Sequence, residues 1–135
     1  ITVSPAQGKA AKGEFNLTHC PDLFPMAVVL ACNTHGEVVL EGVERLAQKE
    51  SNRGETIYRE LAKLGYNIRI EGDKMYLCGK RGRKVDAPVL GCSHNDHRIA
   101  MALYIASLVE EYPVLADEIK CIDKSFPSFV GKLKR

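Results

Sequence analysis

Met26-Ala27-Val28-Val29-Leu30-Ala31-Cys32 is an almost wholly apolar stretch, and a similar stretch, Met101-Ala102-Leu103-Tyr104-Ile105-Ala106-Ser107, follows 75 residues later. The apolar character of the first stretch predicts a buried helix that begins near Pro21. At the same offset Lys49 corresponds to Lys124. A match of seven residues can arise by chance, but the shared lysine favours an internal repeat, whose units stack on one core.

Strands are predicted on both sides of each apolar helix. Alternating or continuous apolar residues bounded by turn signals are typical of half-buried or buried strands. The predicted strands cover residues 14–18 and 37–43 around the first helix, then residues 85–90 and part of 114–121 around the second.

A hairpin is predicted where the alternating residues 66–70 and 74–78 flank a turn at Gly72. The alternation of strands and helices favours an α/β fold, and the hairpin makes its sheets mixed. The repeat then divides the chain into two units, one covering about residues 14–78 and the other about 84–135.

The strand that follows the first apolar helix leads into Lys49-Glu50-Ser51-Asn52-Arg53, which opens a second, amphipathic helix. Ser51 or Asn52 is placed to cap that helix. The first N–H groups of a helix lack partners and favour anions, and Lys49 and Arg53 add positive charge at the same end. One interpretation is an anion site with Glu50 available for proton transfer, and the other is an ordinary polar helix start.

Composition excludes several classes of partner. The net charge of +2 is too small to indicate nucleic acid, and neither a signal peptide nor a run of 18 apolar residues indicates a membrane. The five cysteines form no CxxC pair, and several lie in apolar segments. An odd count with that placement is typical of reduced, buried thiols in a cytoplasmic protein. His94 and His97 have no further metal-ligating neighbour in the sequence, so no metal site is predicted. The chain begins at Ile1, which suggests a fragment.

Charged residues gather at predicted helix starts and strand ends. If the two units stack alike, these ends share one face, which suits a small substrate with several anionic groups. On its own, His97 is interpreted as a hydrogen-bonded residue at a helix start. The residues expected on this face are Asp22, Lys49, Glu50, Arg53, Asp96, His97, Arg98 and Lys124.

Four separated motifs, in this order, resemble the 5-enolpyruvylshikimate-3-phosphate synthase family. The resemblance runs from about Glu14 to the end and corresponds to the C-terminal part of that enzyme. The motifs are Pro21-Asp22, Lys49-Glu50-Ser51-Asn52-Arg53, Asn95-Asp96-His97-Arg98-Ile99-Ala100-Met101-Ala102 and Lys124-Ser125-Phe126-Pro127.

The resemblance implies two domains, each of three βαβαββ units, that close over the substrates, and this chain would hold about two units of one domain. It implies transfer of the enolpyruvyl group of phosphoenolpyruvate to the 5-hydroxyl of shikimate 3-phosphate, with release of phosphate. This is a step of the shikimate pathway of aromatic amino acid biosynthesis. No metal or organic cofactor is implied.

The resemblance also implies roles for three residues in proton transfer. Asp22 is similar to the carboxylate that holds the shikimate ring hydroxyls and accepts a proton. Lys49 is similar to the lysine beside the target hydroxyl. Glu50 is similar to the acid that protonates the methylene carbon of phosphoenolpyruvate, although the division of proton duties among the three stays open.

Other residues correspond to the family's anion ligands. Arg53 and Arg98 resemble the pair that binds the phosphoenolpyruvate carboxylate, and Lys124 resembles a ligand of its phosphate. Asp96 and His97 belong to the same motif with supporting roles. Such anion ligands bring the two substrates together while the methylene carbon of phosphoenolpyruvate gains a proton and the target hydroxyl loses one.

The sequence departs from the family at two positions. Asn52 stands where the family usually has aspartate, and Ala47 stands where it usually has arginine. Asparagine still caps a helix, so the fold is expected to survive. Two alternatives remain: an enolpyruvyl transferase that acts on a UDP-sugar, and a non-catalytic anion-binding module on the same scaffold. The isolated chain is expected to be inactive, because the missing domain supplies half of the cleft.

Overall fold

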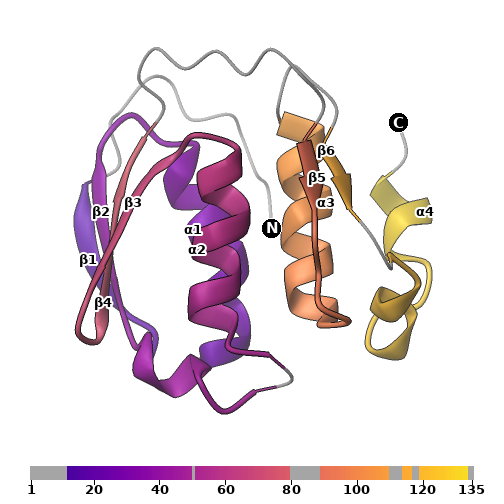
Figure 1. The fold of residues 1–135 in the computed structure, drawn as a ribbon, viewed down its shortest axis with the longest axis horizontal. Helices are drawn as coiled ribbons and strands as arrows, with labels where there is room; N and C mark the ends of the chain where they lie inside the picture. Colours follow the sequence, from indigo (N-terminus) through magenta and orange to yellow (C-terminus); the bar gives the residue numbers. More distant parts are fainter. Residues whose placement is uncertain (1–11, 50, 80–88, 110–113, 117–118, 134–135) are drawn as a thin grey trace, which may run out of the picture.

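The computed structural model describes residues 12–49, 51–79, 89–109, 114–116 and 119–133. Its main sheet is mixed, with strand order β1-β2-β4-β3; β1 and β2 are parallel, and the other neighbours are antiparallel. This arrangement confirms the predicted mixed α/β fold and the hairpin, which is β3 and β4 (Figure 1). The strands are β1 (Gly13–Asn16), β2 (Glu37–Glu41), β3 (Asn67–Glu71) and β4 (Lys74–Cys78).

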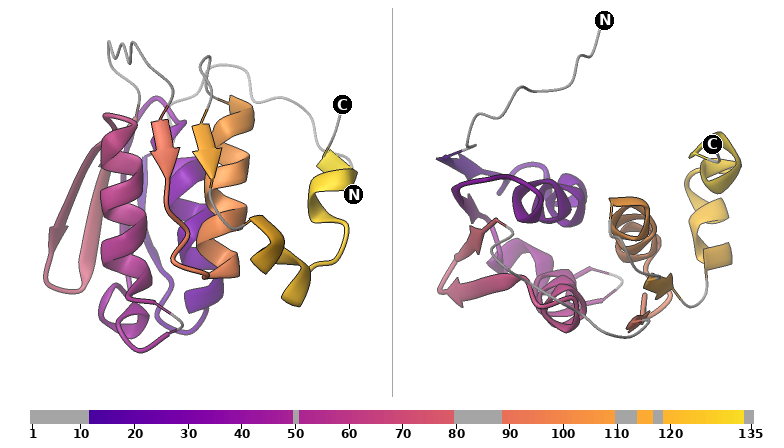
Figure 2. Two further views of the ribbon diagram at one scale, coloured as in Figure 1. Left: turned by 45° about the vertical axis from the view of Figure 1, so that its right-hand side comes forward. Right: turned by 90° about the horizontal axis from the view of Figure 1, so that it is seen from above.

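Two helices cover one face of this sheet, and a third lies beyond them. Figure 2, seen from above, shows the main sheet, then α1 and α2, then α3, and then α4 at the far side. A second, parallel pair of strands, β5 and β6, packs against α3. The helices are α1 (Phe24–Cys32), α2 (Arg53–Lys63), α3 (His97–Val109) and α4 (Phe129–Leu133), and the strands are β5 (Val89–Gly91) and β6 (Val114–Ala116).

The core lies between the main sheet and the three longer helices. In α2, Ile57 and Leu61 point inward together with Leu64 just beyond the helix, at the spacing expected of one helix face. Leu40 of β2 and Met75 of β4 meet them from the sheet. Each such side chain contributes roughly 1.5–3 kcal/mol when it leaves water, so this layer holds α2 firmly in place.

The first helix differs in detail from the prediction. A single 3-10 turn over Pro21–Leu23 precedes α1, and α1 ends at Cys32. Asn33 then bonds back to the last turn, with its side chain donating to the Val29 carbonyl at 2.8 Å. Most of the helix is buried as expected, but Met26 and Ala27 are only partly buried and Leu30 is 62% exposed.

The two parallel strand pairs correspond at the sequence offset of 75. Glu14 of β1 pairs with Val39, and Val89 of β5 pairs with Val114. In both cases a helix of the apolar repeat connects the two strands. The boundaries of the two units stay a prediction, because residues 80–88, between the units, lie outside the described residues.

Within the ranges that the structure describes, no helix combines the length and the apolar character needed to span a bilayer.

Candidate functional site

The start of α2 is fixed by Asn52. Its side-chain oxygen accepts a hydrogen bond from the Glu55 N–H at 3.3 Å, which satisfies one of the unpaired donors of the first turn. The predicted cap is therefore confirmed for Asn52. Ser51 has another role: its hydroxyl donates to Asp96 Oδ2 at 3.0 Å and so reaches the start of α3.

The start of α3 is fixed by Asp96. Its Oδ1 accepts a hydrogen bond from the Arg98 N–H at 2.9 Å, and its carbonyl accepts from Ala100 at 2.9 Å. His94 and Asn95 precede it with φ of 51° and 58°, a left-handed backbone that non-glycine residues adopt rarely. This turn delivers a fully buried Asp96 carboxylate to the start of α2.

Arg53 joins three segments of the chain. Its Nε donates to Asp96 Oδ2 at 2.7 Å, and its Nη1 donates to Asp22 Oδ1 at 2.6 Å. Its side chain is only 1% exposed. A buried guanidinium is stable only when it is paired and hydrogen-bonded, so these contacts lock the starts of the three helical segments to one another.

Asp22 is shared by two arginines. Arg98 Nη2 donates to Asp22 Oδ2 at 3.3 Å, opposite the contact from Arg53. The Asp22 side chain is 51% exposed, so this pair lies at the surface of the cluster. Burial raises the pKa of Asp22, but the Arg53 hydrogen bond and the charges of Arg98, Arg53 and Lys49 outweigh it, and the net pKa lies below the usual 3.8.

One donor in this cluster is left unused. The Nε atom of Arg98 is buried and has no hydrogen-bond partner among the described residues. An unsatisfied buried donor costs free energy, and an acceptor placed against it recovers that cost. Lys124 stands on the same side, where its Nζ donates to Asn95 Oδ1 at 3.1 Å.

The structure brings together most of the residues predicted for the shared face. Four form one bonded cluster, and Lys49 is close enough for its charge to act on Asp22. Lys124 reaches the cluster through Asn95, the neighbour of Asp96. The clustered residues are Asp22, Arg53, Asp96 and Arg98.

Two predicted residues stand apart from this cluster. Glu50 lies outside the described residues. His97 is the half-buried first residue of α3, at a helix start as expected. Its side chain makes no hydrogen bond to another described residue, and its supporting role stays a prediction.

Sequence reasoning assigned no contact to Ser51 beyond a cap, and none to Asn95 or Glu60. The sequence nevertheless held a clue to both residues. Asn95 begins the motif that contains Asp96 and Arg98, and Glu60 lies two helical turns after Arg53 on the same side of the helix. Among the described residues no group of three or more metal-ligating side chains is close enough to hold a metal ion.

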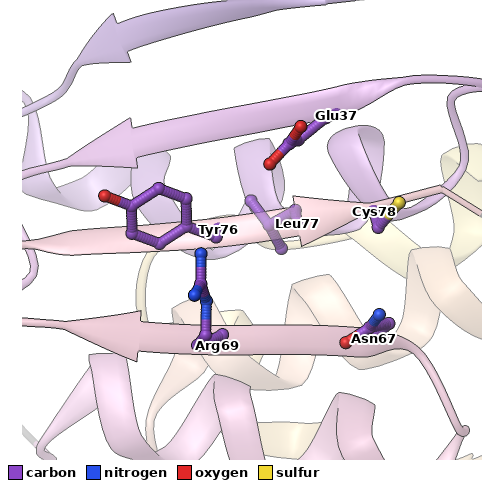
Figure 3. Close-up of a pocket in the computed structure, with 6 residues that line it drawn as sticks. All are labelled: Glu37, Asn67, Arg69, Tyr76, Leu77 and Cys78. Atoms are coloured by element: carbon purple, nitrogen blue, oxygen red, sulfur yellow. The ribbon is translucent and has the colours of Figure 1, made fainter.

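A polar hollow of about 360 Å³ lies elsewhere, over the main sheet (Figure 3). There the Arg69 guanidinium lies 4.4 Å from the centre of the Tyr76 ring and pairs with Glu71 at 2.8 Å. It contains none of the predicted site residues. Its lining consists of Glu37, Asn67, Arg69, Tyr76, Leu77 and Cys78.

Comparisons with known proteins place the chain in a family. The family EPSP synthase (3-phosphoshikimate 1-carboxyvinyltransferase) matches residues 1–133. A 3-phosphoshikimate 1-carboxyvinyltransferase of Clostridium botulinum is 38% identical over 117 residues, which are 87% of this chain and 27% of that protein. The Aeropyrum pernix protein of the same name is 38% identical over 122 residues, 90% of this chain and 28% of its own length.

Solved structures give the same result. An EPSP synthase from Acinetobacter baumannii superposes with a TM-score of 0.72 at 30% identity, over 82% of this chain and 26% of that one. The chain therefore spans about a quarter of the length of the relatives it matches.

Proposed function

Because the chain belongs to the EPSP synthase family, we propose that it is part of a longer enzyme that transfers the enolpyruvyl group of phosphoenolpyruvate to the 5-hydroxyl of shikimate 3-phosphate. Phosphate is the second product. The complete enzyme, meaning this chain together with the rest of its polypeptide, works in the cytoplasm. The odd number of cysteines and the absence of a CxxC pair support that location.

The observation that carries the proposal is the unsatisfied Nε of Arg98 beside the Asp22–Arg53 pair. A guanidinium has five N–H donors in a fixed plane and binds a carboxylate in a two-pronged way. The Nε atom is buried while the Arg98 side chain as a whole is one-third exposed, so a substrate that binds Nε must displace the atoms that cover it. The carboxylate of phosphoenolpyruvate then binds Arg98 and completes its hydrogen bonds, while Arg53 supports it from within the protein.

The remaining roles follow from charge. Asp22 is ionised at neutral pH, as an ordinary aspartate is, and its lowered pKa extends that state to more acidic pH. It therefore holds the ring hydroxyls of shikimate 3-phosphate as an acceptor. Lys49 lies beside the target hydroxyl, and Lys124 binds the phosphate of phosphoenolpyruvate. Glu50 gives a proton to the methylene carbon, and a general acid of this kind contributes about 10²- to 10⁴-fold to the rate.

The isolated chain is inactive under this proposal. It spans about a quarter of its relatives, so the other domain, which supplies the opposite wall of the cleft and further cations, is missing. The substrates are held between the two walls, and one wall alone does not fix the geometry that the reaction needs.

The test is phosphate release by the complete enzyme with phosphoenolpyruvate and shikimate 3-phosphate together. Release that requires both substrates, and is absent from the 135-residue chain, is the expected result. Turnover with a UDP-sugar in place of shikimate 3-phosphate would identify the alternative transferase. Binding of phosphoenolpyruvate without any turnover would instead identify an anion-binding module.

A further inference from the structure

Helix α2 carries a second buried charge, two turns after Arg53. The carboxylate of Glu60 is only 5% exposed, and Lys63 Nζ donates to it at 2.6 Å and 2.8 Å. The Glu60 Oε2 atom also accepts a hydrogen bond from the Cys92 N–H at 2.8 Å. Cys92 directly follows β5 and begins the turn that leads to α3.

Arg53 and Glu60 hold opposite ends of that turn. They lie seven residues apart in α2, a distance of about 10.5 Å along one helix face. Arg53 binds the Asp96 carboxylate at the end of the turn, and Glu60 binds the Cys92 N–H at its beginning. A rigid helix thus fixes the separation of the two ends.

The turn between these ends needs such support. His94 and Asn95 are both left-handed, and backbone of this kind persists only where the surroundings hold it. The same turn presents Asn95 to Lys124 and sets the first turn of α3, which carries Arg98. A shift of the backbone at Cys92 would therefore be passed along the turn to Arg98 and Lys124.

A carboxylate suits this task better than an apolar side chain. Its two oxygens accept from Lys63 and from the Cys92 N–H at once, and hydrogen bonds to a charged group are shorter and stronger than neutral ones. An apolar residue of the same size leaves the Cys92 N–H without this acceptor.

We propose that Glu60 is a positioning residue for enolpyruvyl transfer: it holds the Cys92 end of the turn so that Arg98 and Lys124 meet phosphoenolpyruvate. The inference rests on the proposed function. Glu60 itself acts through the backbone and touches no substrate.

The experiment compares three variants of the complete enzyme. Glu60→Met fills the space but removes the acceptor, and Glu60→Gln keeps an oxygen for the Cys92 N–H. Glu55→Ala is the matched control, because Glu55 lies in the same helix but in an exposed pair with Arg59. Steady-state kinetics are measured with each substrate varied, and amide exchange is measured by mass spectrometry over residues 90–98.

Glu60→Met is expected to lower kcat/KM for phosphoenolpyruvate on the order of 10- to 100-fold, with little change in KM for shikimate 3-phosphate. Amide exchange over the turn rises in the same variant. Glu60→Gln recovers most of the loss, and Glu55→Ala behaves as the unaltered enzyme. If Glu60→Met does not fold, Glu60→Asp replaces it, since its shorter side chain withdraws the acceptor but keeps the charge.

Unchanged kinetics in Glu60→Met, or a folded Glu60→Gln as impaired as Glu60→Met, would overturn the inference. A loss shared equally by both substrates would also overturn it, because it indicates a general structural role. If the enzyme without substitutions shows no transferase activity, the proposed function is refuted instead. The amide exchange of residues 90–98 then still tests whether Glu60 holds the turn in place.

Discussion

At the scale of single residues, the geometry of the site depends on which arginine pairs with which carboxylate. Arg53 is buried between two carboxylates, and Asp22 is held by two arginines at the surface. A buried charge is held tightly because losing one partner leaves the other uncompensated. Arg53 and Asp96 therefore fix the geometry, whereas Asp22 and Arg98 remain open to a ligand.

Removing Asp96 is expected to cost much of the stability of the chain. Asp96→Ala leaves the buried Arg53 guanidinium without one of its carboxylates, and broken buried pairs cost about 3–5 kcal/mol. Glu55→Ala, in the exposed pair with Arg59, changes the unfolding free energy by no more than about 1 kcal/mol. Urea unfolding of both variants checks this, and equal effects would contradict the central role of the Arg53–Asp96 pair.

The Asp22 carboxylate predicts a dependence of stability on pH. Its pKa in the folded chain lies below the usual 3.8, so its stabilising contribution is fully present above that value and is lost as the pH falls through the folded pKa. The unfolding free energies of the chain and of Asp22→Asn should therefore differ most near neutral pH and converge in acid. A difference that grows as the pH falls would mean that the pKa is raised.

At the scale of elements, the sequence predicted the hairpin and α2, because residues close together in the chain determine both. The hairpin follows from alternating residues on both sides of Gly72, which has a φ of 57°, and α2 follows from a cap and an apolar stripe. The turn before α3 was not predicted. Its left-handed His94 and Asn95 depend on Asp96 and Glu60 contacts with residues more than 30 positions away.

The cap of α2 gives a prediction for that element. Asn52→Ala removes the acceptor of the Glu55 N–H and is expected to cost about 0.5–2 kcal/mol of unfolding free energy. Asn52→Asp keeps the acceptor and adds a negative charge at the helix start, which stabilises by about 0.3–1 kcal/mol at low salt. Chemical unfolding at two salt concentrations measures both changes. A more stable Asn52→Ala variant would argue against the cap.

The structure brings part of the predicted set of site residues together, and their roles stay a prediction. Asp22, Arg53 and Arg98 lie at or beside helix starts, and the structure joins these starts. What the sequence did not reveal is that Arg53 is almost wholly buried and that Arg98 keeps an unpaired donor. The burial of these side chains depends on how α1, α2 and α3 pack together, and that packing cannot be predicted from short stretches of sequence.

At the scale of the whole molecule, the main sheet is followed by α1 and α2, then by α3, and then by α4, as Figure 2 shows from above. The charged cluster joins the 3-10 turn Pro21–Leu23 to the starts of α2 and α3. The chain spans about a quarter of its relatives. Under the proposed function the chain forms one wall of the cleft, and we propose that this wall binds phosphoenolpyruvate through Arg98 and Lys124.

The most direct test of that assignment is the steady-state kinetics of Arg98→Ala in the complete enzyme, with each substrate varied in turn. The variant loses a charge-assisted contact worth roughly 1.5–3 kcal/mol, so the apparent affinity for phosphoenolpyruvate should fall on the order of 10- to 100-fold. Affinity for shikimate 3-phosphate, which lies toward Asp22 and Lys49, should change much less. A loss confined to shikimate 3-phosphate would contradict the account.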